Sequence, residues 1–157
     1  MNYIKFLVTL FTIIIVIACG NKSKDQVLYY DGDEFTAQTE EGVEMRFKVI
    51  SAENKTVQVG IGDKDNHNQA IDTKYKGKVT IPQEVNGFRV ESISEYAFGL
   101  CDMSKIEIPE GVRTIQDDAF FMCDYIREIK LPTSLTTIGN GAFAGCDRLH
   151  SIYIPRN

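Results

Sequence analysis

The stretch Ile115-Gln116-Asp117-Asp118-Ala119-Phe120 decides the fold, because near copies of it stand on either side of it along the chain. The earlier copy is Ile93-Ser94-Glu95-Tyr96-Ala97-Phe98, and the later copy is Ile138-Gly139-Asn140-Gly141-Ala142-Phe143. A cysteine follows each phenylalanine by three positions, so the Ala-Phe-Cys columns recur after 22 and then 23 residues. A period of this length predicts stacked supersecondary units, a solenoid, and argues against a single globular core.

Each unit also contains a short run of alternating apolar residues that ends at a proline. The runs are Val79-Thr80-Ile81-Pro82, Ile106-Glu107-Ile108-Pro109, Ile129-Lys130-Leu131-Pro132 and Ile152-Tyr153-Ile154-Pro155. Alternation predicts strands with one apolar face, and proline ends a strand because it has no N–H to donate. We expect each Ala-Phe pair to begin a short helical or 3₁₀ turn, with Asp117 and Asn140 as N-caps, and the three phenylalanines to stack as an internal spine.

The combined pattern, I-x-x-x-A-F-x-x-C-x-x-[ILM]-x-x-I-x-[IL]-P, resembles the BspA-like leucine-rich repeat of the TpLRR type. The resemblance covers residues 78–155, and it loosens in the first unit around Met103-Ser104 and Asn86-Gly87. It implies an extracytoplasmic, protein-binding solenoid, often on a bacterial surface, whereas the pattern itself indicates only a solenoid. The predicted fold class is a β-rich (α+β) solenoid, a short leucine-rich-repeat array of about three coils over residues 78–157.

Residues 35–77 predict an N-terminal β-hairpin capping region whose apolar side covers the first coil. Residues 43–49 and 56–61 alternate, a turn-forming segment separates them, and residues 26–30 and 35–38 are candidate extra strands. At the other end the sequence given stops at Asn157, directly after the last predicted strand. We therefore expect the terminal rung, residues 151–154, to associate with another chain or to pair only weakly.

The amino terminus predicts export and a lipid anchor. Residues 1–18 have the length and order of a signal peptide, and Val16-Ile17-Ala18-Cys19 resembles a lipobox whose cysteine is acylated. The alternative is an ordinary signal peptide with a chance cysteine. Residues 19–34 predict a flexible tether. Because Gly20 and not aspartate follows Cys19, the expected location is the outer membrane or the cell surface, with the side of the membrane left open.

Composition excludes some functions and leaves the cysteines open. The net charge is −5, and no basic cluster exceeds two residues, so nucleic-acid binding is not expected. With Cys19 lipidated, three cysteines remain, Cys101, Cys123 and Cys146. The favoured interpretation is a ladder of buried thiols packed as small apolar groups, and the alternatives are a disulfide between two of them or a metal site.

Nothing in the sequence predicts an enzyme, a cofactor or a metal centre. The segment Asp63-Lys64-Asp65-Asn66-His67-Asn68 has a superficial likeness to a calcium loop, but it lacks the glycine at the sixth position and has Lys74 at the twelfth. We interpret it as a polar loop. The two histidines, His67 and His150, stand beside no nucleophile motif.

The outward face of the strands is the candidate binding face. We expect opposite charges on neighbouring rungs to pair there, Lys105 with Glu128 and Glu107 with Lys130, and Tyr153 to be an exposed contact residue. These observations favour a lipid-anchored cell-envelope module that binds an unidentified host or surface protein. The alternatives are a structural or assembly subunit of a larger surface complex, and a glycan-binding surface lipoprotein.

Overall fold

The computed structural model describes residues 27–62 and 69–155, and these ranges contain strands and turns but no helix. Within them, no helix is long and apolar enough to cross a membrane. The signal peptide, Cys19 and the calcium-like segment 63–68 lie outside the described residues. The strands are β1 (Glu34–Gln38), β2 (Glu44–Ser51), β3 (Thr56–Val59), β4 (Lys78–Thr80), β5 (Glu84–Val85), β6 (Phe88–Ile93), β7 (Lys105–Glu107), β8 (Thr114–Ile115), β9 (Glu128–Lys130), β10 (Thr137–Ile138) and β11 (Ser151–Tyr153).

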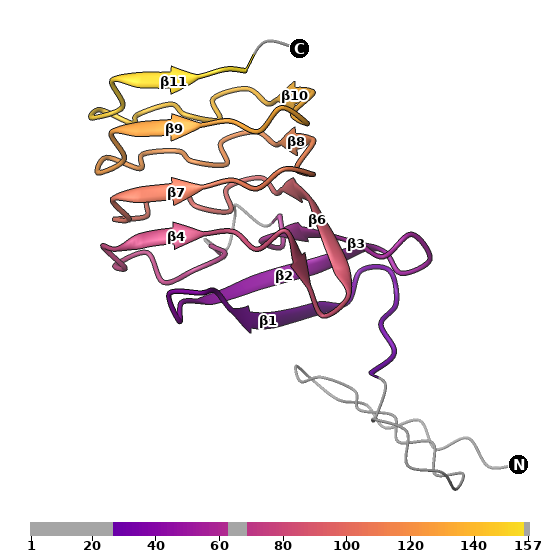
Figure 1. Ribbon diagram of the computed structural model, residues 1–157. Coiled ribbons are helices and arrows are strands. Elements are labelled where there is room, and N and C mark those ends of the chain that lie inside the picture. The colour runs from indigo at the N-terminus through magenta and orange to yellow at the C-terminus, as the bar shows by residue number, and fades with distance from the viewer. Residues whose placement is uncertain (1–26, 63–68, 156–157) are drawn as a thin grey trace, which may run out of the picture.

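The repeats form a solenoid, as the sequence predicts (Figure 1). Coil 1 contains β6 and β7, coil 2 contains β8 and β9, and coil 3 contains β10 and β11, with an Ala-Phe turn between the two strands of each coil. On one side β6, β8 and β10 pair in parallel from coil to coil. On the other side β4 pairs with β7, and β9 pairs with β11, also in parallel.

The predicted capping hairpin is present as β2 and β3, and the candidate strand at residues 35–38 is present as β1 (Figure 1). Because these strands alternate, one face is apolar, and Met45, Phe47, Val57 and Val59 are all fully buried. Strand β3 then pairs in parallel with β6, so the cap and the side of the solenoid that carries β6, β8 and β10 form one seven-stranded sheet. The described part of the other candidate strand, residues 27–30, has no strand structure.

The folded cap begins earlier than the predicted boundary at residue 35. The ring of Tyr29 packs at 5.0 Å from the ring of Phe35 and at 5.3 Å, edge-on, from the ring of Phe88. The Gly32 N–H donates to the Val49 carbonyl at 2.9 Å. The second half of the predicted tether is therefore joined to the cap by aromatic packing and by a backbone hydrogen bond.

The Ala-Phe segments are not helical, so the expectation of a helical or 3₁₀ turn with N-caps is wrong. In the turns of coils 1 and 2, alternate N–H groups donate to carbonyls of the next coil: Phe98 to Ala119, and Phe120 to Ala142, both at 2.8 Å. A helix would use those N–H groups within its own coil. The predicted cap Asp117 accepts, through Oδ1, the N–H of Asn140 in coil 3 at 2.8 Å.

Left-handed backbone conformations prevent a helix at two columns of each turn. Leu100, Met122 and Gly145 occupy one column, with φ of 61°, 56° and 72°. Tyr96, Asp118 and Gly141 occupy the other column, with φ of 57°, 52° and 61°. Only in coil 3 are both positions glycine, which adopts this conformation without the steric cost of about 1–2 kcal/mol that other residues carry. The hydrogen bonds between coils offset that cost in coils 1 and 2.

The three phenylalanines form the predicted spine. The rings of Phe98 and Phe120 stack with centroids 5.2 Å apart and an interplanar angle of 6°, and those of Phe120 and Phe143 stack at 5.3 Å and 10°. Phe98 and Phe120 are fully buried, whereas Phe143 in coil 3 is partly buried. The alanine before each phenylalanine is buried as well, and its small side chain lets the backbones approach.

The cysteines Cys101, Cys123 and Cys146 are buried free thiols packed in the core, the favoured of the three interpretations. The Cys123 Sγ–H donates to the Phe98 carbonyl at 2.9 Å, and the Cys146 Sγ–H donates to the Phe120 carbonyl at 3.0 Å. Burial raises the pKa of Cys101 to about 12, so this thiol stays protonated at physiological pH. The cysteine column therefore packs between coils as small apolar groups with weak donors.

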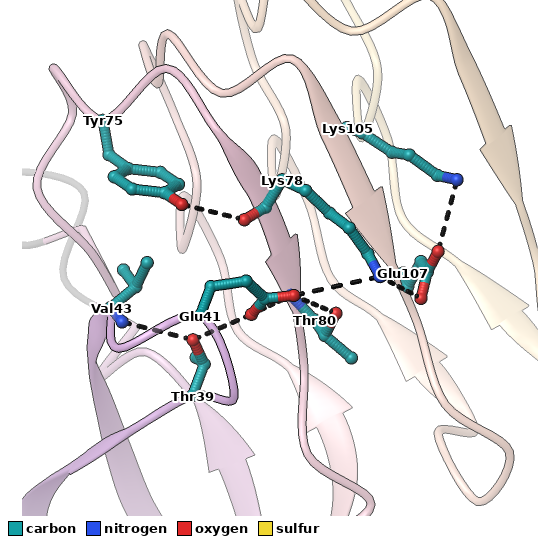
Figure 2. A network of polar contacts seen from close by, with 8 residues as sticks. All are labelled: Thr39, Glu41, Val43, Tyr75, Lys78, Thr80, Lys105 and Glu107. Carbon is teal, nitrogen blue, oxygen red and sulfur yellow. Dashed lines mark hydrogen bonds and ion pairs between the residues drawn. The ribbon is translucent and has the colours of Figure 1, made fainter.

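The carboxylate of Glu41, a residue of the cap, accepts hydrogen bonds at the outer edge of strand β4 (Figure 2). Glu41, in the turn between β1 and β2, accepts hydrogen bonds from the Thr80 N–H at 3.2 Å and the Thr80 Oγ1–H at 2.5 Å. It also accepts from the Thr39 Oγ1–H at 3.0 Å. Partial burial opposes ionisation of Glu41, but these hydrogen bonds together hold the pKa of its carboxyl below the usual value. Strand β4 thus has a partner on its exposed edge, where unpaired donors would invite association with other strands.

The stacking of the phenylalanine spine predicts that truncating Phe120 lowers the free energy of unfolding more than truncating Phe143 does. Phe120→Ala removes a ring that stacks on both neighbours and should lower the free energy of unfolding by about 3–5 kcal/mol. Phe143→Ala removes a partly buried ring with one stacking partner, and we expect about half that loss. Urea denaturation followed by circular dichroism measures both. Equal losses would contradict the stacking order of the coils.

The Glu41 contact predicts a pH-dependent stability. Because the folded-state pKa of Glu41 is lowered, its stabilisation is present at neutral pH and is lost as the pH falls through that pKa, below the ordinary glutamate value of about 4.3. Glu41→Gln should therefore lower stability at pH 7 by about 1 kcal/mol, and the difference should shrink as the pH falls through the lowered pKa. Urea midpoints across that range test this. The matched control is Glu40→Gln, beside it, and a loss there as large as in Glu41→Gln would show that the contact is not responsible.

Candidate functional site: the strand face

Strands β4, β7, β9 and β11 follow one another along one side of the solenoid (Figure 1). The strand face is the surface formed by their outward side chains. A groove of about 700 Å³ lies on it. All five side chains of the predicted binding face line this groove: Lys105, Glu107, Glu128, Lys130 and Tyr153. The structure thus gathers them at one place, with Glu110, Pro132 and Ser151 as further lining residues.

The groove lies where the strand ladder is interrupted. Strands β7 and β9 belong to successive coils, yet they form no sheet pairing and no backbone hydrogen bond joins them. A difference in repeat length accounts for the interruption. Ile106 follows Cys101 by five positions, whereas Ile129 follows Cys123 by six and Ile152 follows Cys146 by six. The strands of coils 2 and 3 therefore keep a common register on this side. In coil 1 the segment between the cysteine and the strand is one residue shorter.

The charges on the first half of the strand face neutralise one another (Figure 2). Glu107 lies 2.9 Å from the ammonium of Lys78 and 3.2 Å from that of Lys105. Hydrogen bonds from the two lysines hold the pKa of the Glu107 carboxyl below its usual value, and the same contact with Glu107 raises the pKa of Lys78. Lys78 also lies 3.9 Å from Glu41, so this network joins the cap to β4 and β7.

The predicted ion pairs between β7 and β9 are not the ones that form. We expected Lys105 to pair with Glu128, and Glu107 to pair with Lys130, but Glu107 takes both lysines of the β4–β7 pair. The physical reason is the interrupted ladder, since paired strands bring opposite side chains within about 5.5 Å and β7 and β9 do not pair. Within the described ranges, Glu128 and Lys130 have no ion-pair partner.

The second half of the strand face, formed by β9 and β11, is open to solvent. The parallel register places Ser151 beside Glu128 and Tyr153 beside Lys130. Tyr153 is 63% exposed, which makes it one of the most exposed large hydrophobic side chains of the described residues. The four side chains form a two-by-two array that combines a carboxylate, an ammonium, a hydroxyl and an aromatic ring. Such an array can bind polar and aromatic surface of a partner, since aromatic residues are enriched at protein contacts.

Glu110 lines the groove, but its carboxylate already accepts hydrogen bonds from the neighbouring coil. Its carboxylate accepts hydrogen bonds from the Thr133 N–H and the Thr133 Oγ1–H, both at 2.9 Å, and from the Ser134 N–H at 3.2 Å. The backbone bond from Thr133 is the main cause that holds the pKa of the Glu110 carboxyl below its usual value. This residue joins coil 1 to the turn that follows β9. The alternating pattern gave no signal for it, because it follows the proline that ends a strand.

Coil 3 exposes apolar side chains that are buried in coil 2. Ile138 is 43% exposed and Ile152 is 38% exposed, whereas the corresponding Ile115 and Ile129 are at most 1% exposed. A further layer would cover these side chains, whether it came from residues beyond Pro155 or from another molecule. The expectation that the terminal rung pairs weakly or with another chain stays a prediction.

The described residues contain no group of three or more histidine, cysteine, aspartate or glutamate side chains that could hold a metal ion. His150 is exposed and its ring nitrogen contacts the carbonyl of Arg148. The charged, hydroxyl and aromatic side chains that line the groove can make ion pairs, hydrogen bonds and ring contacts.

Comparison with known proteins agrees with the repeat pattern. A family model described as "BspA type Leucine rich repeat region (6 copies)" matches residues 76–157. Among solved structures, the crystal structure of a leucine-rich-repeat protein of T. pallidum (TpLRR) is similar, with a TM-score of 0.40 and 18% sequence identity. The match covers 77% of this chain and 68% of that one. No curated protein matches the chain.

The family match spans about half of the chain and covers all three coils. Leucine-rich repeats are generally scaffolds for protein–protein interaction without enzyme activity, and a stacked array offers an extended surface for this purpose. The repeat pattern, the solenoid and the family match lead to the same conclusion: the chain belongs to the BspA-type leucine-rich-repeat family.

Proposed function

We propose that the protein is a lipid-anchored binding module of the cell envelope that holds a protein partner on its strand face. One observation carries the proposal: Glu128 and Lys130 line the groove without an ion-pair partner in the described ranges, next to the exposed ring of Tyr153. Elsewhere on the same face the charges pair with one another. Only the half formed by β9 and β11 has charges left for a partner.

The lipid anchor is supported by the sequence of the amino terminus. Residues 1–18 have the features of a signal peptide, and Cys19 stands where a lipobox cysteine is acylated. Each buried methylene of an acyl chain contributes about 0.8 kcal/mol to membrane binding, so two or more chains anchor a protein of this size stably. We place the anchored module at the outer membrane or the cell surface, where it meets a host or surface protein.

A second candidate is an assembly subunit, in which another chain adds a layer to coil 3. The exposed Ile138 and Ile152 favour it, because their counterparts in coil 2 are covered. Any segment that follows Pro155 would compete for the same surface. A glycan-binding role has less support, since Tyr153 is the one aromatic residue among those that line the groove.

The anchor predicts a specific lipid label. In cells grown with an alkyne fatty acid, the wild-type protein should carry the label and sediment with membranes, and Cys19→Ser should lose both properties. Cys101→Ser, which changes a buried cysteine of the repeats, is the matched control and should keep the label. Labelling that persists in Cys19→Ser would remove the anchor from the proposal. Protease treatment of intact cells then reports whether the module faces outward.

The strand face predicts which substitutions abolish partner capture. The purified module should retain a protein from cell-surface or extracellular-matrix extracts, and Tyr153→Ala or Lys130→Glu should reduce the retained amount at least about tenfold. The matched control is Glu84→Lys, a charge reversal on β5 outside the groove, which should change nothing. Capture that is unchanged in both groove variants would exclude the strand face as the binding site.

A further inference from the structure

We propose that the segment of the partner that occupies the half of the groove formed by β9 and β11 is an extended strand with a basic and an acidic side chain two positions apart. This inference rests on the proposed function and deepens it. It derives from three features of the groove: the spacing of its two unpaired charges, the absence of pairing between β7 and β9, and the neighbouring aromatic ring.

The two charges require a partner with both signs. Glu128 and Lys130 are exposed and have no ion-pair partner in the described ranges. Covering an ion without compensation costs free energy, because the ion loses its hydration. A neutral segment compensates neither charge, and a segment of one sign is repelled by one of the two. A segment that offers a base to Glu128 and an acid to Lys130 compensates both.

The spacing of the charges matches an extended chain. Residues two positions apart in a strand lie on the same face at about 6.6 Å, so Glu128 and Lys130 present their groups at the repeat distance of a second strand. The groove runs along β7 and β9, whose backbones are not bonded to each other. An extended segment places side chains two positions apart on one face at this spacing, whereas residues two positions apart in a helix do not share a face.

Tyr153 completes the array on the side of β11. Its register partner is Lys130, and its ring is 63% exposed. A segment laid along β9 therefore contacts the ring with the part that lies next to its acidic residue. Aromatic surface of this kind supports binding without imposing a charge preference, so the preference for mixed charges is assigned to Glu128 and Lys130 alone.

Charge exchange on β9 tests the inference as a switch of specificity. The probes are three capped heptapeptides, Thr-Val-Lys-Thr-Glu-Val-Thr and its variants with lysine at both charged positions or with glutamate at both. Amide chemical shifts of residues 128–130 in ¹⁵N-labelled protein at low salt report binding. Wild type should prefer the mixed peptide about fivefold over either like-charged one, a size typical of exposed ion pairs, and the preference should vanish at high salt.

The variants should change the preference in a defined order. Glu128→Lys should prefer the peptide with two glutamates, and Lys130→Glu should prefer the peptide with two lysines. The double variant, which carries both Glu128→Lys and Lys130→Glu, should again prefer the mixed peptide. The peptide should then bind with its chain direction reversed relative to the wild-type complex. Glu84→Lys, outside the groove, should keep the wild-type preference. All three positions are exposed, and thermal melts confirm folding.

Three results would overturn the inference. The first is a peptide preference that does not follow the exchanges. The second is the absence of any chemical shift change at residues 128–130 with every peptide at millimolar concentration. The third is binding that ignores charge and is lost only in Tyr153→Ala, which would indicate ring stacking alone. Should partner capture still depend on Tyr153 and Lys130, the strand face binds a protein by another geometry and the proposed function stands. Should capture be independent of both, the proposed function fails as well.

Discussion

The hydrogen bonds that run from coil to coil through the Ala-Phe turns are the constraint on which the rest of the structure depends. The N–H groups of Phe98 and Phe120 each reach the carbonyl of the alanine in the next coil at 2.8 Å. Bonds of that length hold successive turns at the spacing of neighbouring strands, about 4.8 Å. Only small side chains fit between backbones so close, which explains the alanine and cysteine columns. The phenylalanine rings, stacked at 5.2 and 5.3 Å, fill the interior at the same spacing.

Because the Ala-Phe turns are held at a fixed spacing, any difference in repeat length affects the strands on the opposite side of the coils. Strands β6, β8 and β10 stay in register with the turns, but β7 arrives one residue earlier in its coil than β9 and β11 do in theirs. The ladder is interrupted at that step and a groove lies over it. The interruption also separates the charges of the strand face. The cap, β4 and β7 form a closed network through Glu41, Lys78 and Glu107, and β9 is left outside it.

This separation connects the fold to the proposed function. A solenoid holds its surface side chains at fixed spacing with little freedom to reorganise, so unpaired charges on it remain available to a partner. The cap contributes by occupying the outer edge of β4 through Glu41, so the second half of the strand face is the part that we propose for recognition. The arrangement is that of a rigid recognition surface, in keeping with a family of interaction scaffolds.

The repeat pattern was sufficient to predict the solenoid, the phenylalanine spine, the buried cysteine column and the apolar hairpin of the cap. These features follow from local rules, since a side-chain period of two and a repeat of 22 or 23 residues restrict the chain to stacked coils. The same rules suggested helical turns and were wrong there. Whether an N–H bonds within its own coil or to the next one depends on a neighbour that local propensity does not describe.

The sequence by itself determined which residues face outward on the strands, and it named five of the six charged and aromatic residues that line the groove. Only the tertiary structure decided which of those charges are already paired. Glu107 could reach lysines on three different rungs, and the choice depended on the register between strands of separate coils. The register between strands of successive coils depends on the number of residues in each repeat and on the contacts between the coils. For that reason Glu128 and Lys130 emerge as the available pair only when the coils are stacked.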